Sequence, residues 1–367
     1  MKQKILVSLA ATALLGLTAC KGGATAAGGK LIPEQATIMV GIDVGGLMKT
    51  KLYGENKAEF EKQKDYSEMA AAAKACNLDP EKALNSVLIG TDGKANVVAV
   101  LTGEGLGDEK NLTCIADKAK EKNGGKTPFT IVDEAGKKTL KLESGEGTGY
   151  IVDGKTVVFA SKAWEGAVKD LIDGKGKSAN DGPNKDLFDR ADRSKHIWAA
   201  GLVPAEMAGG AKSMGADAKD FSVSFDLSDG LALKAMVGLA SADQAKDLKK
   251  KGDDNLPGAK MMAGMMGVPP KALETVKIDT KDNMITVEAS LSNDDLKIIK
   301  DKAGAMMGGA GGGGDMGGMP MDKPPLPAEA APVGDAGAAG APAGTPPAGG
   351  DAAGGTPPAA PAPTPAQ

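Results

Sequence analysis

The sequence predicts an α+β fold made of two similar, mostly antiparallel sheet-plus-helix modules, followed by a disordered C-terminal tail. Three observations support this prediction. Apolar and polar residues alternate over short stretches that hairpin-type turns connect, which is typical of antiparallel strands. Amphipathic helices separate the hairpins, and the order of elements in residues 31–183 occurs again in residues 184–302.

The first module begins with a strand, because Ile38, Val40, Ile42 and Val44 fall on one face of an alternating stretch. A long helical stretch is expected over residues 46–75. The following elements are a hairpin, a helix, four strands and a closing helix, over residues 86–90, 96–102, 108–122, 129–133, 139–143, 148–152, 156–160 and 164–172.

The second module repeats this order with a strand over 196–203, a short helical or irregular segment, and a hairpin that turns at Ser228-Asp229-Gly230. A helix is expected to begin at Ser241, where Gln244 completes a capping-box pattern. A second hairpin and a final helix follow. We interpret the two halves as a duplicated module in which helices cover one face of each sheet.

The composition changes abruptly at Ala303. Thirteen of the 21 prolines lie in residues 303–367, together with long runs of Gly and Ala. Such a segment cannot bury enough apolar surface to offset the entropy lost on ordering. Residues 303–367 are therefore predicted to form a disordered tail.

The N-terminus has the pattern of a secretory signal. Lys2 and Lys4 precede an apolar run over residues 5–17, which is too short to span a bilayer and is followed by small residues and Cys20. We expect a signal peptide over residues 1–19 and a flexible, small-residue tether over residues 20–30.

The tetrapeptide Leu17-Thr18-Ala19-Cys20 resembles the lipobox of bacterial lipoproteins. The resemblance implies cleavage before Cys20 and a diacylglyceryl group on its sulfur, with acyl chains such as palmitate. It therefore implies a lipoprotein anchored to a membrane of the bacterial cell envelope and facing the periplasm or the cell surface. Lys21 stands where the inner-membrane retention signal of enteric bacteria has Asp, which resembles sorting to the outer membrane.

Charge and glycine patterns argue against several partners. The 44 basic and 48 acidic residues are interspersed and give a net charge of −4, so no basic surface for nucleic acid is expected. The glycine-rich stretch from Gly103 to Gly107 lacks the Lys-Ser/Thr of a phosphate loop, and nucleotide binding is not expected either. After Cys20 there is no apolar run of membrane-spanning length, so we expect attachment through the lipid alone.

Residues for catalysis are scarce. His196 is the one histidine of the chain, and we interpret it as a core or strand-edge residue. The chain therefore lacks the residues for a hydrolytic triad or for a metal site built on His or Cys clusters. The sequence predicts a non-enzymatic protein without a cofactor, and an enzyme that uses carboxylates alone is the remaining catalytic alternative.

Two cysteines remain after lipidation. Cys76 and Cys114 are predicted to form a disulfide, which an exported compartment permits, and two buried free thiols are the alternative.

Methionines form two groups at spacings that resemble the Met motifs of envelope copper proteins. Thioethers select Cu(I), so the resemblance implies a soft-metal site. The candidate ligands in the tail are Met316, Met319 and Met321. For the helical group we favour a packed helix face, because Met is a permissive gap-filling residue. This group comprises Met261, Met262, Met265 and Met266.

The function predicted from these observations is a membrane-anchored envelope lipoprotein that acts as a binding or structural module. Its partners would be the membrane, through the N-terminal lipid, and an envelope protein. Two alternatives stay open. One is Cu(I) binding by methionines. The other is transport of an apolar ligand on the sheet face, which requires an uncovered apolar concavity.

Overall fold

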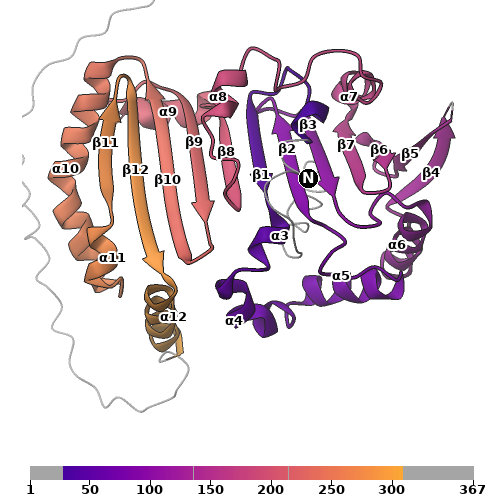
Figure 1. The fold of residues 1–367 in the computed structure, drawn as a ribbon, viewed down its shortest axis with the longest axis horizontal. Helices are drawn as coiled ribbons and strands as arrows, with labels where there is room; N and C mark the ends of the chain where they lie inside the picture. The colour runs from indigo at the N-terminus through magenta and orange to yellow at the C-terminus, as the bar shows by residue number, and fades with distance from the viewer. Residues whose placement is uncertain (1–27, 135, 214, 309–367) are drawn as a thin grey trace, which may run out of the picture. The chain divides into compact units, whose positions relative to one another are not determined.

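The computed structural model describes residues 28–308, apart from residues 135 and 214, and within this part twelve strands form one antiparallel sheet with helices around it (Figure 1). The α+β class and the antiparallel pairing are therefore as predicted. In order across the sheet, the strands are β11 (Lys277–Lys281), β12 (Met284–Ser292), β10 (Gly230–Leu239), β9 (Ala218–Asp226), β8 (Ile197–Leu202), β1 (Ile38–Ile42), β2 (Ser86–Thr91), β3 (Val97–Thr102), β7 (Thr156–Ser161), β6 (Gly147–Asp153), β5 (Lys137–Leu142) and β4 (Phe129–Glu134).

The helices lie mostly between strands that are consecutive in the sequence. They are η2 (Gly29–Leu31), α3 (Val44–Leu47), α4 (Lys51–Phe60), α5 (Lys64–Ala75), α6 (Glu109–Lys122), η3 (Lys162–Trp164), α7 (Glu165–Ile172), α8 (Lys185–Asp189), α9 (Ala205–Ser213), α10 (Ala242–Met265), α11 (Pro270–Glu274) and α12 (Asn293–Gly308).

The prediction of a separate sheet in each module is wrong, because β1 and β8 pair along their whole length. Their register runs from Ile38 opposite Gly201 to Ile42 opposite Ile197. The Asp43 amide donates to the His196 carbonyl at 2.7 Å and closes one end of the ladder. Both strands are largely apolar, and an unpaired edge on either would expose a row of backbone donors and acceptors. Pairing the two edges removes this cost and joins the modules into one sheet.

The two halves nevertheless have the same strand order. Counting outward from the central pair, β1-β2-β3-β7-β6 corresponds to β8-β9-β10-β12-β11. α6 follows β3 as α10 follows β10, and α7 follows β7 as α12 follows β12. Strands β4 and β5 extend the first half and have no counterpart in the second.

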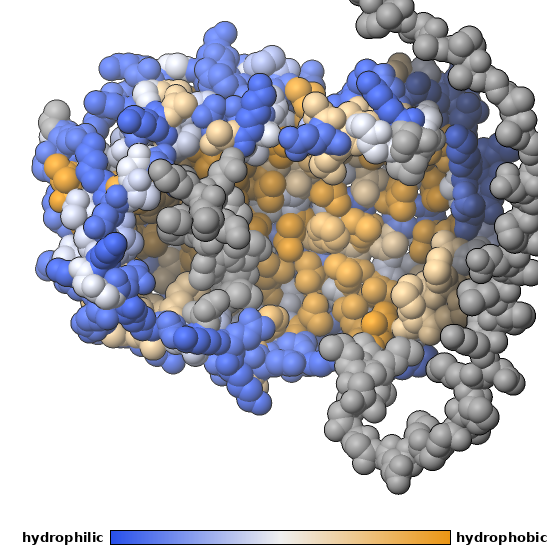
Figure 2. All heavy atoms as spheres, turned by 180° about the vertical axis from the view of Figure 1, so that it is seen from behind, coloured by the Kyte–Doolittle hydropathy of each residue, from blue (hydrophilic) through white to orange (hydrophobic). Residues whose placement is uncertain are grey.

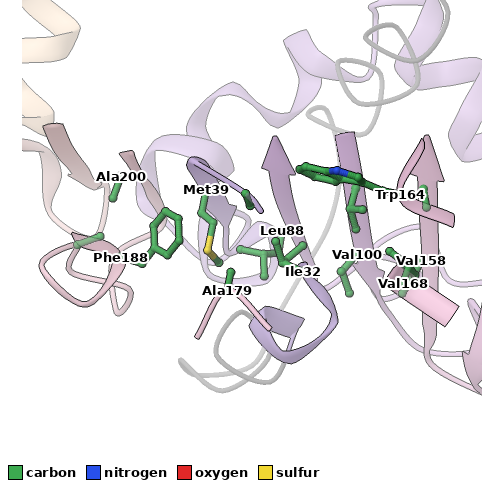
Figure 3. Close-up of a cluster of buried hydrophobic side chains, with 14 of the residues drawn as sticks. Ile32, Met39, Leu88, Val100, Val158, Trp164, Val168, Ala179, Phe188 and Ala200 are labelled. Carbon is green, nitrogen blue, oxygen red and sulfur yellow. The ribbon is translucent and has the colours of Figure 1, made fainter. Parts of the chain in front are cut away.

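One face of the sheet, which we call the covered face, packs against two long connections. Met39, Leu88 and Val98 point to this side and are fully buried. Side chains from residues 31–36 and 164–191 cover them, with Trp164, Val168 and Phe188 prominent (Figure 3). The covering segments are bonded to each other, because the Ala179 amide donates to the Ile32 carbonyl at 2.7 Å.

The opposite face, which we call the open face, packs against helices over parts of its area. Over the central strands, α3 and the segments around α5 and α6 contribute to a cluster with Ile42 and Val87. Over β10 and β12, α10 packs Ala245 and Leu248 against Leu239 and Ile285. The α10 cap is as predicted, since the Ser241 hydroxyl accepts from the Gln244 amide.

Several boundaries differ from the predictions. The helical stretch expected over 46–75 is divided into three helices: Thr50 caps the start of α4, and α5 begins after Gln63 without a side-chain cap. Gly28 and Gly29, expected in the tether, are buried, and a Cβ at Gly29 would meet the Asn180 side chain. α12 continues to Gly308, beyond the predicted start of the tail at Ala303. The signal peptide over 1–19 and the rest of the tail lie outside the described residues.

Gly41 leaves room for a large side chain between β1 and β8, because it has no side chain of its own. The indole of Trp198 is fully buried and lies against Gly41, its partner in the β1–β8 ladder. A Cβ at Gly41 would lie 2.2 Å from Nε1 and 2.3 Å from Cε2 of that ring. Real Cβ atoms do not approach this closely, so any larger residue must displace a rigid, enclosed side chain.

We expect Gly41→Ala to lower the free energy of unfolding by about 1–3 kcal/mol, the usual cost of overpacking a core. Urea denaturation measures this loss. The control is Gly54→Ala in α4, where the new methyl group meets no atom within 4 Å. The control should gain roughly 0.5–1 kcal/mol from helix propensity. Equal effects of the two substitutions would contradict the packing described for Trp198.

Candidate functional site

The open face carries a continuous row of apolar residues across all twelve strands. Each member lies directly opposite the next in the strand register, so the row crosses the sheet at right angles to the strands. From β11 to β4 the row is Ile278, Val287, Ala235, Val223, Ala199, Val40, Ile89, Ala99, Phe159, Gly149, Leu140 and Ile131. We call this set the central row.

The central row is only partly covered. Its members from Ile278 to Phe159 are half-buried, whereas covered-face residues of the same strands, such as Met39 and Val98, are fully buried. Gly149 and Leu140 are buried at the end where α6 packs. Neighbouring rows on the same face are also apolar, with Phe221 and Phe225 on β9 and Leu233 and Val237 on β10.

Seen from this side, the molecule has a hollowed apolar surface between hydrophilic borders (Figure 2). Strands β12, β10, β9, β8, β1, β2, β3 and β7 each have hydrogen-bonded neighbours on both sides. Their backbone groups are therefore paired within the sheet, and the surface between the borders offers mainly aliphatic and aromatic carbon. Such a surface can hold an apolar group, and it supplies little to orient a polar one.

The helices at one end of the open face are fastened by a disulfide. Cys76 at the C-terminal cap of α5 is bonded to Cys114 in α6, with an S–S distance of 2.04 Å, so the predicted pair is present. A second link joins the same helices, because Lys122 Nζ lies 3.1 Å from Glu68 Oε2. The disulfide closes a loop with a sequence separation of 38 residues beside the apolar surface.

Replacing both cysteines, Cys76→Ala with Cys114→Ala, should lower the free energy of unfolding by about 4 kcal/mol, the chain-entropy value for a loop of this length. Chemical denaturation of the oxidised protein and of the double variant measures the difference. Adding a reductant should destabilise the parent protein and leave the variant unchanged. An unchanged midpoint in the variant would show that the crosslink does not constrain the unfolded chain.

The covered face has a different character over β9 to β11. Here most residues that line a cavity of about 430 Å³ carry charged or hydroxyl side chains, although Ala232, Leu233 and Ala289 also line it. The charges are paired, with Lys195 Nζ 2.7 Å from Asp226 Oδ2 and Lys234 Nζ 2.9 Å from Glu288 Oε1. The hydrogen bond from Lys195 holds the pKa of Asp226 well below its usual range. Each of these charged groups has a partner of opposite charge, as is usual on a solvated polar surface.

His196 has a structural position, as expected. Its Nδ1 accepts a hydrogen bond from the Leu227 amide at 3.1 Å and lies 3.3 Å from Asp226 Oδ1. The ring thereby fixes the start of the β9–β10 turn. Among the described residues no group of three or more His, Cys, Asp or Glu side chains is arranged to hold a metal ion.

The remaining candidates have mixed outcomes. Cys20, Met316, Met319 and Met321 lie outside the described residues. The packed face predicted for the methionines of α10 is wrong, because all four side chains are between 57% and 68% exposed.

The sequence alternation indicated the apolar strand faces. The continuous row across the sheet depends on the β1–β8 pairing, which the sequence did not reveal.

The chain was compared with protein-family models, with curated proteins and with solved structures, and none of these matches it. In the described part of the chain, no helix is both long enough and apolar enough to cross a membrane.

Proposed function

We propose that this protein is a lipid-anchored lipoprotein of the bacterial cell envelope that binds hydrocarbon chains on the open face of its sheet. The observation on which the proposal depends is the central row, a half-buried apolar surface that continues across the joined modules. Leaving this much apolar area in water is costly for a monomer, and large exposed apolar patches are characteristic of binding sites.

The chemistry of the open face favours hydrocarbon over peptide. An extended peptide laid on a sheet face would leave its own backbone donors and acceptors without partners, since those of the sheet are already used. A second copy of the chain is also disfavoured, because two hollowed surfaces cannot contact each other over most of their area. Hydrocarbon chains need no hydrogen bonds and can follow a concave surface.

The dimensions suit acyl chains. The half-buried part of the central row crosses nine strands, which at the ordinary strand spacing corresponds to about 38 Å. The acyl chains of one bilayer leaflet span about 15 Å of the hydrocarbon core. One chain therefore fits along the row, and two fit end to end.

The anchor would hold this surface near its source of ligand. Cys20 and the buried Gly28 are eight residues apart, so an acylated Cys20 keeps the folded body within about 30 Å of the bilayer. A protein held at that distance is suited to taking up or presenting lipids of the same membrane. In this proposal the protein is not an enzyme, and it binds neither nucleotides nor nucleic acid. The C-terminal tail is available for an envelope partner.

We further propose that the two halves arose by duplication of one module. The equal strand orders on the two sides of the β1–β8 pair support this interpretation. Duplication also explains why both halves direct an apolar face to the same side.

Ligand binding on the open face can be tested with two alanines of β10. Ala235 belongs to the central row, whereas Ala232 is exposed on the opposite face, beside Asp226. Ala235→Lys would place an ammonium group where the ligand must lie, and should weaken binding of an uncharged fluorescent probe such as phenylnaphthylamine by at least about tenfold, since desolvating a charge is costly. Ala232→Lys should bind the probe as the parent does.

Long-chain fatty acid or diacyl phospholipid should displace the probe from the parent protein. Equal probe affinities in two variants that fold normally would place the ligand elsewhere and contradict the proposal for the open face. Circular dichroism and urea midpoints establish that both variants fold.

The anchor can be tested separately in cells. Cys20→Ala should abolish labelling by radioactive palmitate and should release the protein from the membrane fraction, because one acylated residue supplies the proposed attachment. Cys76→Ala is the matched control and should keep the label. Unchanged labelling of the Cys20 variant would refute lipidation at this residue without affecting the proposal for the sheet.

A further inference from the structure

The end of α10 exposes four methionines in two adjacent pairs. Met261, Met262, Met265 and Met266 are 68%, 57%, 68% and 63% exposed. The same helix buries Ala245 against the sheet, so its apolar contacts are made elsewhere along its length. Large apolar side chains gathered in water do not stabilise the fold, and a packing role cannot explain them.

Helix geometry brings these side chains together. Met261 and Met265, and likewise Met262 and Met266, are separated by four residues, and Met262 and Met265 by three. Side chains at these separations are surface neighbours, with Cβ atoms about 5–6 Å apart. Met262 and Met265 each have two such neighbours within the group, so three thioethers can converge on one point above the helix.

A cluster of thioethers has a specific chemical preference. Thioether sulfur is a soft, neutral ligand that selects Cu(I) over hard cations. It needs no deprotonation to bind, unlike thiolate or imidazole ligands, so binding would release no protons. We propose that Met261, Met262, Met265 and Met266 form a site for a soft monovalent metal ion, Cu(I) in the cell. This inference does not depend on the proposed lipid binding.

The test uses the full chain from residue 20 with Cys20→Ser, so that the remaining cysteines are in the disulfide. Anaerobic Cu(I) titration against a competing chelator measures affinity, and Ag(I) titration monitored by methionine methyl NMR identifies the ligands. The Met262→Leu, Met265→Leu variant should bind Cu(I) at least about tenfold more weakly, which corresponds to about 1.4 kcal/mol. Leucine preserves size and helix propensity at these exposed positions.

Two controls locate the site. Met207→Leu removes a methionine that is 67% exposed on α9, and should leave the affinity unchanged. Replacing Met316, Met319 and Met321 by leucine should also leave the tightest binding unchanged. The proposal is overturned if the α10 variant binds as the parent does, or if the tail variant alone loses the tightest site. Ag(I) shifts confined to methyl groups outside α10 would overturn it as well.

Discussion

The backbone pairing of β1 with β8 is the constraint on which the rest of the structure depends. It removes an unpaired edge from each half of the chain and fixes the register between them. Because that register places Val40 opposite Ala199, the apolar faces of the two halves join into a single surface. A shift of one residue would turn one half over and break the central row at its middle. The open face is therefore a property of the joined sheet and not of either module.

The two faces of the sheet have different roles: the covered face contributes mainly to stability, and the open face is the proposed binding surface. The covered face holds the large fully buried side chains, including Trp198 and Met39, which two long connections enclose. The open face holds medium-sized side chains that stay half-buried. Substitutions on the covered face therefore act mainly on folding, whereas the open face can vary with its ligand as long as it remains apolar.

Much of the fold could be predicted from local patterns. Alternation identified most strands, and Ser241 with Gln244 identified the start of α10, since both signals depend on neighbours in sequence. The β1–β8 pair could not be predicted, because strands more than 150 residues apart leave no local sign of their pairing. The exposure of Met261 and Met265 could not be predicted either. Their spacing is the same on a packed helix face and on a free one, and only the position of α10 against the sheet distinguishes the two.

The burial of Gly28 and Gly29 determines how the body responds to mechanical load. Gly28 lies against Leu88 and Val100 of the covered face, and the following residues are bridged to the segment around Ser178. A pull applied ahead of Gly28 would therefore be resisted by the Ile32–Ala179 and Glu34–Lys177 backbone bonds before any strand of the sheet is reached. Tension at the N-terminus would be borne by the connection that closes the core, and the strands that form the open face would keep their register.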